Sequence, residues 1–297
     1  MLWSPKKALR FLVLSAVSAA TVLAGPPEAE NLSKEGWRLY RLGEFNSAVQ
    51  IFQSLHSPAP TESDAEIEGL YGEASCWNFR RDRRDAARAI QLYDRILSKA
   101  PDHPLAAWAA LDRVRAKYLG AIDFDHNAEM ARAFGDVAKT YEGTPAGEEA
   151  FFLSMNQQVP EMDVAKARQL DEEIGEYLRL HPKSLFLSRL LSLQAACCDV
   201  LDRQAERLEK MVLALESREY DERNPRADGA LSYWQIAYAA EFQAGDFTLA
   251  REYYQRLIRE YPKDIRVFGA RRALERMDVV EAAVRAGQSI PSQWEAP

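Results

Sequence analysis

The chain of 297 residues is long enough for one extended repeat array or for two ordinary domains. Hydrophobic residues make up 47% and charged residues 28%, and the scarcity of glycine and proline, 14 of each, favours an all-helical fold. The net charge of -7 argues against binding to nucleic acid through its phosphates, which requires a basic surface.

Residues 1–24 have the pattern of a secretory signal peptide. Lys6, Lys7 and Arg10 precede an apolar run over 11–24, which ends in Val-Leu-Ala as a signal-peptidase site does. The run is short for a membrane span, and no cysteine follows it as a lipid attachment site. We therefore expect export, to the periplasm, without an N-terminal lipid anchor and without a membrane span in the mature chain. An uncleaved membrane anchor is the alternative.

After a lead over 25–31, which we expect to be flexible, helical periodicity begins near Leu32. The first two helices are joined by a turn at Gly43, and the same turn chemistry recurs near the C-terminal end at Gly245. Glycine suits a left-handed helix stop, and Asp246, which follows the second glycine, can cap the next helix.

The two ends of the chain carry the same landmarks. They are the pairs Gly43 and Gly245, Phe45 and Phe247, Ala48 and Ala250, Phe52 and Tyr254, and Pro60 and Pro262. All keep a constant separation of 202 positions. This regularity indicates that the two ends are copies of one helix hairpin. In the later copy we expect Trp234, Ala237 and Tyr238 to lie on the buried face of the first helix.

Helix-ending positions recur between these copies at intervals close to 40. They are Pro60, Pro101, Glu142, Pro182, the loop around Asp221, and Pro262. The spacing predicts an all-α fold over 32–277, a right-handed α-solenoid of about six hairpins with a capping helix at its C-terminal end. A short helix and a loose tail are expected over 278–297. One continuous array is favoured, and a domain boundary at 221–228 is the alternative.

The hairpin over 230–262 resembles a tetratricopeptide repeat (TPR), with Trp234, Ala250, Tyr254 and Pro262 at the offsets of that motif. The stretches 134–150 and 174–184 hold phrases such as Tyr-Glu-Gly-Thr-Pro and His-Pro-Lys-Ser. These are similar to the TPR form of bacterial envelope proteins, including the TPR proteins of outer-membrane β-barrel assembly and of the Tol system. The missing lipid-attachment cysteine departs from the assembly-machine pattern. The resemblance implies a scaffold that binds other proteins on the concave face of a superhelix.

We expect no enzyme and no cofactor or metal, because no catalytic or metal-binding constellation is recognisable. The histidines do not pair at helical spacing, and we expect those beside turns, including His56, to be solvated. A calcium-loop start at Asp123 lacks the required glycine and glutamate further on. Cys197 and Cys198 suit core packing in a helix, with a bridge to Cys76 as the alternative.

The candidate partner-binding residues are Arg38, Arg41, Gln235 and Glu241 on the exposed side of first helices, and the basic cluster Arg80, Arg81, Arg83 and Arg84. The basic cluster is either a solvated turn or a docking site for an acidic partner. The expected function is that of a non-catalytic exported scaffold of the cell envelope, with proteins or peptides as partners. The alternative is a helical accessory component of a cell-wall (peptidoglycan) enzyme system.

Overall fold

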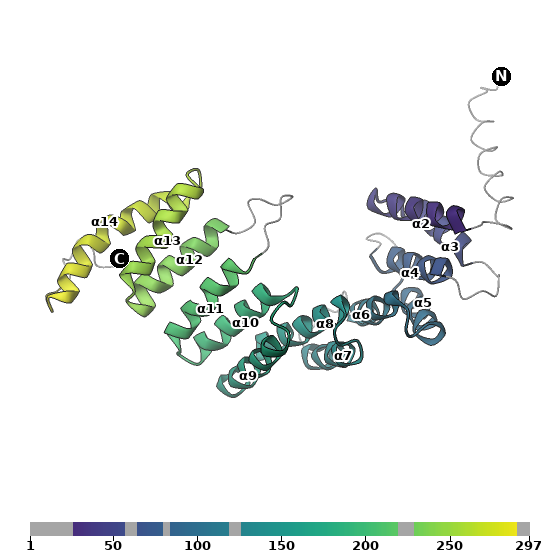
Figure 1. The fold of residues 1–297 in the computed structure, drawn as a ribbon, viewed down its shortest axis with the longest axis horizontal. Coiled ribbons are helices and arrows are strands. Elements are labelled where there is room, and N and C mark those ends of the chain that lie inside the picture. The colour runs from purple at the N-terminus through teal and green to yellow at the C-terminus, as the bar shows by residue number, and fades with distance from the viewer. Residues whose placement is uncertain (1–25, 57–63, 80–83, 119–125, 219–228, 290–297) are drawn as a thin grey trace, which may run out of the picture. The chain divides into compact units, whose positions relative to one another are not determined.

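The computed structural model describes residues 26–56, 64–79, 84–118, 126–218 and 229–289 (Figure 1). These residues form thirteen α-helices and no β-strand, which confirms the expected all-helical repeat fold. No helix among them is long and apolar enough to cross a membrane. The expected signal peptide at 1–24 lies outside the described residues, and the handedness of the array stays a prediction.

The chain divides into two compact units, Met1–Ser154 and Met155–Pro297. The first unit holds α2 (Pro26–Arg41), α3 (Phe45–Leu55), α4 (Asp64–Phe79), α5 (Ala86–Lys99), α6 (Pro104–Tyr118), α7 (Asn127–Thr140) and most of α8 (Pro145–Asn156). The second holds η2 (Val159–Glu161), α9 (Val164–Leu180), α10 (Leu187–Val200), α11 (Gln204–Glu216), α12 (Gly229–Ala239), the π-helical turn η3 (Ala240–Ala244), α13 (Phe247–Glu260) and α14 (Arg266–Arg285). The boundary between the units falls within α8. The alternative boundary at 221–228 lies outside the described residues, and a single continuous array stays a prediction.

Most of the predicted helix ends are confirmed. The helices α5, α7, α9 and α13 each end two residues before a predicted stop, at Pro101, Glu142, Pro182 and Pro262. Pro60 and Asp221 lie outside the described residues. In chain order the helices therefore form six successive pairs followed by α14, as the spacing predicts.

The first and last helices differ from the prediction at their ends. The lead at 25–31 is helical from Pro26, because proline fits the first turn of a helix, where N–H groups have no partner within the helix. At the other end α14 continues through Met277 without a break. It is stopped only by Gly287, whose φ of +65° ends a helix in the left-handed conformation.

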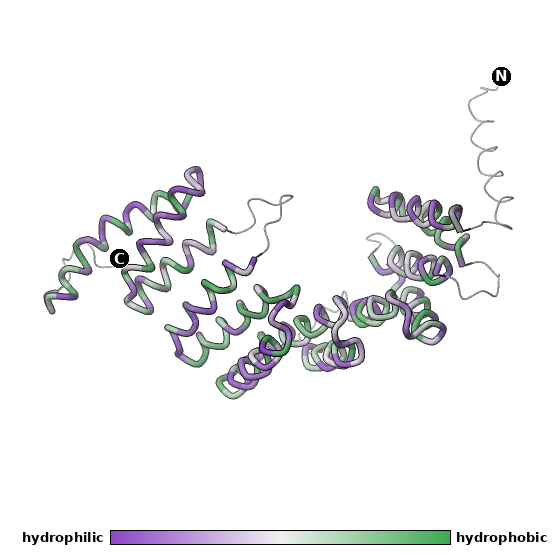
Figure 2. The backbone as a smooth tube through the Cα atoms, viewed as in Figure 1, coloured by the Kyte–Doolittle hydropathy of each residue, from purple (hydrophilic) through white to green (hydrophobic). Residues whose placement is uncertain are grey.

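Burial within the second unit confirms the expected face of α13 and corrects that of α12. Ala250 and Tyr254 of α13 are fully buried. On α12, Ala237 is buried as expected, but Tyr238 is 46% exposed. The core position belongs instead to Tyr233, whose ring contacts that of Tyr253 edge-on at 5.8 Å. Figure 2 shows the alternation of hydrophobic and hydrophilic residues along the helices that one-sided burial requires.

Candidate functional site

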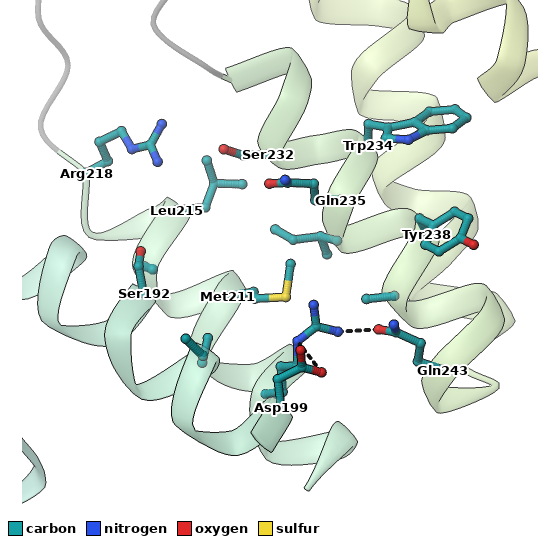
Figure 3. A pocket seen from close by; sticks show the side chains of 16 residues that line it. Ser192, Asp199, Met211, Leu215, Arg218, Ser232, Trp234, Gln235, Tyr238 and Gln243 are labelled. Carbon is teal, nitrogen blue, oxygen red and sulfur yellow. Dashed lines mark hydrogen bonds and ion pairs between the residues drawn. The ribbon is translucent and has the colours of Figure 1, made fainter. Parts of the chain in front are cut away.

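The second unit contains a groove of about 580 Å³ between α10, α11 and α12, which we call the α10–α12 groove (Figure 3). One stripe of each helix lines it, at helical spacings of three and four residues. The stripes are Ser192, Ala195, Ala196 and Asp199 on α10; Arg207, Met211, Ala214 and Leu215 on α11; and Ser232, Gln235, Ile236 and Ala239 on α12. Trp234, Tyr238, Gln243 and Arg218 complete the lining.

The floor of the groove is apolar. Met211 and Leu215 point from α11 toward Gln235 of α12 (Figure 3). Alanines on all three helices keep the space open, because an alanine side chain ends at Cβ. A methionine in the floor is unbranched and flexible, so it can adapt its shape to different apolar groups.

One end of the groove is closed by an arginine whose charge is already compensated. The guanidinium of Arg207 donates a hydrogen bond to the side-chain oxygen of Gln243 (Figure 3). Its Nε lies 3.4 Å from the carboxylate of Asp199. Because these groups satisfy one another, they fix the end of the groove without leaving a strong net charge there.

Gln235, one of the candidate residues from the sequence, lies on the rim of this groove and is exposed. Its amide can both donate and accept hydrogen bonds, which suits the backbone of a bound chain. The spacing in the sequence could place Gln235 on an exposed face. It could not reveal the groove, because the stripes on α10 and α11 come from a different hairpin.

Glu241 is not exposed, contrary to the expectation. It is 7% exposed and accepts hydrogen bonds from the guanidinium of Arg276, at 3.0 Å from Nε and 2.5 Å from Nη2. The hydroxyl of Tyr254 donates a further bond to it at 3.0 Å. Glu241 follows the buried Ala237 by four residues, so both lie on the same face of the helix. Its carboxylate therefore serves packing between η3, α13 and α14.

The candidate arginines of the first unit have different environments. Arg38 is held on the helix surface by two hydrogen bonds to Glu35, both at 2.7 Å. Arg41 is exposed and lines a second hollow of about 370 Å³ beside Trp37. Arg84 is half-buried and donates to the backbone carbonyl of Ala116 at 2.7 Å, which ties the start of α5 to α6. The other arginines of the basic cluster lie outside the described residues.

A buried carboxylate cluster in the first unit escaped the sequence analysis. Glu73 is 1% exposed and accepts hydrogen bonds from His56 at 2.7 Å, Gln53 at 2.8 Å, Arg88 at 2.7 Å and Trp77 at 3.0 Å. Burial alone would raise the pKa of Glu73, but the bonds from His56, Gln53 and Trp77 outweigh it and lower the pKa to about 2. The expectation of a solvated His56 is therefore wrong.

This cluster joins α3, α4 and α5 through a charged group that is fully hydrogen-bonded, so its evident role is structural. Among the described residues, no group of three or more histidine, cysteine, aspartate or glutamate side chains could hold a metal ion. The three cysteines are buried and form no disulfide with one another, as core packing predicts. Burial raises the pKa of Cys197 to about 11, so this thiol is protonated and unreactive near neutral pH.

Residues 231–264 match the family model of the tetratricopeptide repeat. The match spans α12, η3 and α13, which is the hairpin whose landmarks resemble that motif. No match to a curated protein is found. The match and the all-helical series of hairpins together support a TPR protein. TPR repeats generally mediate protein–protein interactions, and folds of this kind are typically binding scaffolds without catalytic activity.

Proposed function

We propose that this protein is a non-catalytic scaffold of a bacterial cell envelope, exported to the periplasm, and that it binds a segment of a partner protein in the α10–α12 groove. The observation that carries the proposal is the groove itself. It is open to solvent and has an apolar floor, and its volume of about 580 Å³ is within the range of ligand-binding sites.

The lining of the groove suggests the kind of segment that it binds. Met211 and Leu215 offer apolar contact area, and Gln235 offers an amide for the backbone of the segment. The Arg207–Asp199 pair is compensated and gives little preference for charge. A short peptide with two or more apolar side chains on one side therefore suits the groove better than a strongly charged one.

Export rests on a different observation, the signal-peptide pattern of residues 1–24. Removal of its three basic residues leaves a more acidic mature chain, which favours protein partners over nucleic acid. Fractionation of expressing cells and N-terminal sequencing test this part. The expected product starts at Gly25 in the periplasmic fraction. A chain that keeps residues 1–24 in the cytoplasm would contradict export and leave the groove unaffected.

Binding in the groove is tested by photo-crosslinking in cells. A photoreactive residue at Gln235 should link a defined partner, whereas the same residue at Gln255, exposed on α13, should not. The identified partner is then measured against the purified chain. Met211→Glu places a charge on the apolar floor and should weaken binding at least about tenfold. Equal crosslinking at both positions, or unchanged affinity of the Met211 variant, would refute the groove as the binding site.

A further inference from the structure

The last helix of the second unit, α14, has a buried face and an exposed face on opposite sides. Ala270, Ala273 and Met277 lie in the core formed with α12 and α13. The opposite side carries residues spaced three and four apart, which we call the α14 stripe: Ile265, Phe268, Arg272, Glu275, Val279 and Ala282. All six are exposed, Ile265 by 87% and Phe268 by 75%.

Two features set this stripe apart from an ordinary solvated face. A helix face that lies in solvent is ordinarily polar, yet the stripe exposes Ile265 and Phe268 almost completely. Its alternating spacing of three and four residues is also the pattern by which one helix pairs with another along its length. The apolar residues lie toward the two ends of the stripe, and the charged pair Arg272 and Glu275 lies at its centre.

This order of residues is complementary to itself. In an antiparallel pair of α14 helices, with the two-fold axis between Arg272 and Glu275, the arginine of each copy meets the glutamate of the other. The same axis places Phe268 against Val279 of the second copy and Ile265 against Ala282. A two-fold interface requires that one surface fit its own copy, and this stripe satisfies that requirement at each of its layers.

Charges beside the stripe fit the same arrangement. Arg271 and Asp278 are both exposed and flank one border of the stripe, so antiparallel pairing brings opposite charges together there. Asp278 pairs with Arg251 at 3.2 Å in the single chain, but its side chain stays 76% exposed. Parallel pairing would instead oppose Arg272 to Arg272 and Glu275 to Glu275. Like charges directly across a helix pair destabilise it. The charges therefore favour antiparallel over parallel pairing of two copies of α14.

We propose that the protein forms an antiparallel dimer through the α14 stripe. In the single chain, Arg272 and Glu275 pair on their own helix at 2.9 Å, with side chains 56% and 59% exposed. In the dimer each group exchanges this solvated contact for one across the interface. One helix face is a small interface, so we expect a dissociation constant on the order of micromolar. The proposal does not depend on the α10–α12 groove.

Sedimentation velocity of the full chain between about 1 and 100 µM tests the dimer. The unchanged chain should pass from monomer to dimer across this range. Phe268→Glu buries an unpaired charge in the interface and should weaken association at least about tenfold. Phe268 is largely solvated in the single chain, so circular dichroism should show unchanged helicity and melting for this variant.

A charge exchange then identifies the contact. Arg272→Glu alone and Glu275→Arg alone should each weaken self-association, because they place like charges across the two-fold axis. An equimolar mixture of the two variants should associate again, as should the double variant. Arg179→Glu, which removes a comparably exposed ion pair on α9, serves as the control and should leave association unchanged.

Three results would overturn the proposal. The first is an unchanged chain that stays monomeric over the whole concentration range. The second is a dimer that tolerates Phe268→Glu or is not restored in the charge-exchange mixture, since its interface then lies elsewhere. The third is a full chain that is monomeric but dimerises when cut after Ser289, which would place the following residues, rather than a second copy, on the stripe.

Discussion

The first and the last described hairpins, α2–α3 and α12–α13, have the same landmark residues. They differ in the hydrogen bonds of their turns and in the contacts around their central aromatic rings. Ala48 and Phe52 of α3 and Ala250 and Tyr254 of α13 are all fully buried. Gly43 and Gly245 both adopt the left-handed conformation, with φ of 78° and 68°. The landmarks shared along the sequence therefore perform the same tasks in both hairpins: they stop one helix and fill the core of the next.

The hydrogen bond that closes each turn spans one residue more in the last hairpin than in the first. In the first hairpin the N–H of Glu44 donates to the carbonyl of Leu39, five residues back, at 3.0 Å. In the last hairpin the N–H of Asp246 donates to the carbonyl of Ala240, six residues back, at 2.8 Å. The π-helical turn η3 accommodates the extra residue. The shared turn pattern, a glycine followed by an acidic residue and phenylalanine, thus fixes where the chain reverses without fixing how the preceding helix ends.

The residues around the central aromatic ring differ as well. A Cβ atom on Gly36 or Gly72 would lie only 2.7 or 2.4 Å from the ring of Phe52, so glycine is what lets the helices approach there. Both rings meet a tryptophan edge-on, Phe52 that of Trp37 at 5.0 Å and Tyr254 that of Trp234 at 5.4 Å. Tyr254 differs in that its hydroxyl also donates a hydrogen bond to Glu241. The repeat motif determines where the helices cross. The residues around the motif determine whether small residues or a polar network fill the space at that crossing.

Removal of the two central rings should have the largest effect. Phe52→Ala and Tyr254→Ala each leave a cavity at a fully buried site and should cost about 3–5 kcal/mol. Hydrogen exchange followed by mass spectrometry should show the loss of protection in residues 26–154 for the first variant and in 155–289 for the second. Equal loss in both units for either variant would contradict their separation into two compact units.

The polar network of the last hairpin gives the next prediction. Arg276→Ala leaves Glu241 buried without its cation and should destabilise the second unit by about 3 kcal/mol. Arg38→Ala, which removes an exposed ion pair of the first hairpin, should leave the melting midpoint unchanged. A double variant, Glu241→Leu with Arg276→Leu, should recover much of the lost stability. An Arg276 variant as stable as the unchanged chain would show that the ion pair contributes nothing to the hairpin.

These differences mark the limit of prediction from the sequence. The constant separation of landmarks and the recurrence of helix stops predicted six hairpins, their turns and the buried face of α13, because these properties depend on local residue types. The assignment of Glu241 to the exposed side failed for a different reason. Charge alone suggested exposure, while its helical position relative to Ala237 placed it in the core, where Arg276 from a distant helix neutralises it.

The α10–α12 groove could not be predicted from the sequence. Gln235 could be assigned to an exposed face, but Met211 and Leu215 come from another hairpin and read as ordinary core residues. Their position beside Gln235 depends on how α11 approaches α12. The Glu73 cluster illustrates the same limit, because Gln53, His56 and Arg88 come from two other helices. Contacts between different helices, even consecutive ones, leave no periodic signal in the sequence of either helix.

The buried carboxylate of the first unit predicts a dependence of stability on pH. The pKa of Glu73 is about 2 in the folded chain and ordinarily 4.5, so the unfolded chain takes up the proton first as pH falls. Its contribution, up to about 3 kcal/mol, is fully present above about pH 5 and is lost between about pH 5 and pH 2. Chemical denaturation of the unchanged chain across this range should show the loss.

Glu73→Gln removes the titrating group and provides the control. It should be less stable than the unchanged chain at pH 7, and the difference between the two should shrink as pH falls toward 2. Signals from the first unit should carry this change, because Glu73 lies between α3, α4 and α5. A stability difference that stays constant from pH 7 to pH 2 would mean that Glu73 does not hold its low pKa through these contacts.

The smallest expected effect is a difference in helix capping between the two turns. Asp246 accepts a hydrogen bond from the N–H of Leu249 at 3.0 Å and so caps α13, whereas the side chain of Glu44, at the same place before α3, makes no such bond. Asp246→Ala should therefore cost about 1 kcal/mol, and Glu44→Ala should cost close to nothing. Thermal denaturation of both variants measures the contrast. Equal losses would mean that the residue after the glycine acts through its charge at the helix start, and that the difference in capping between the hairpins has no energetic weight.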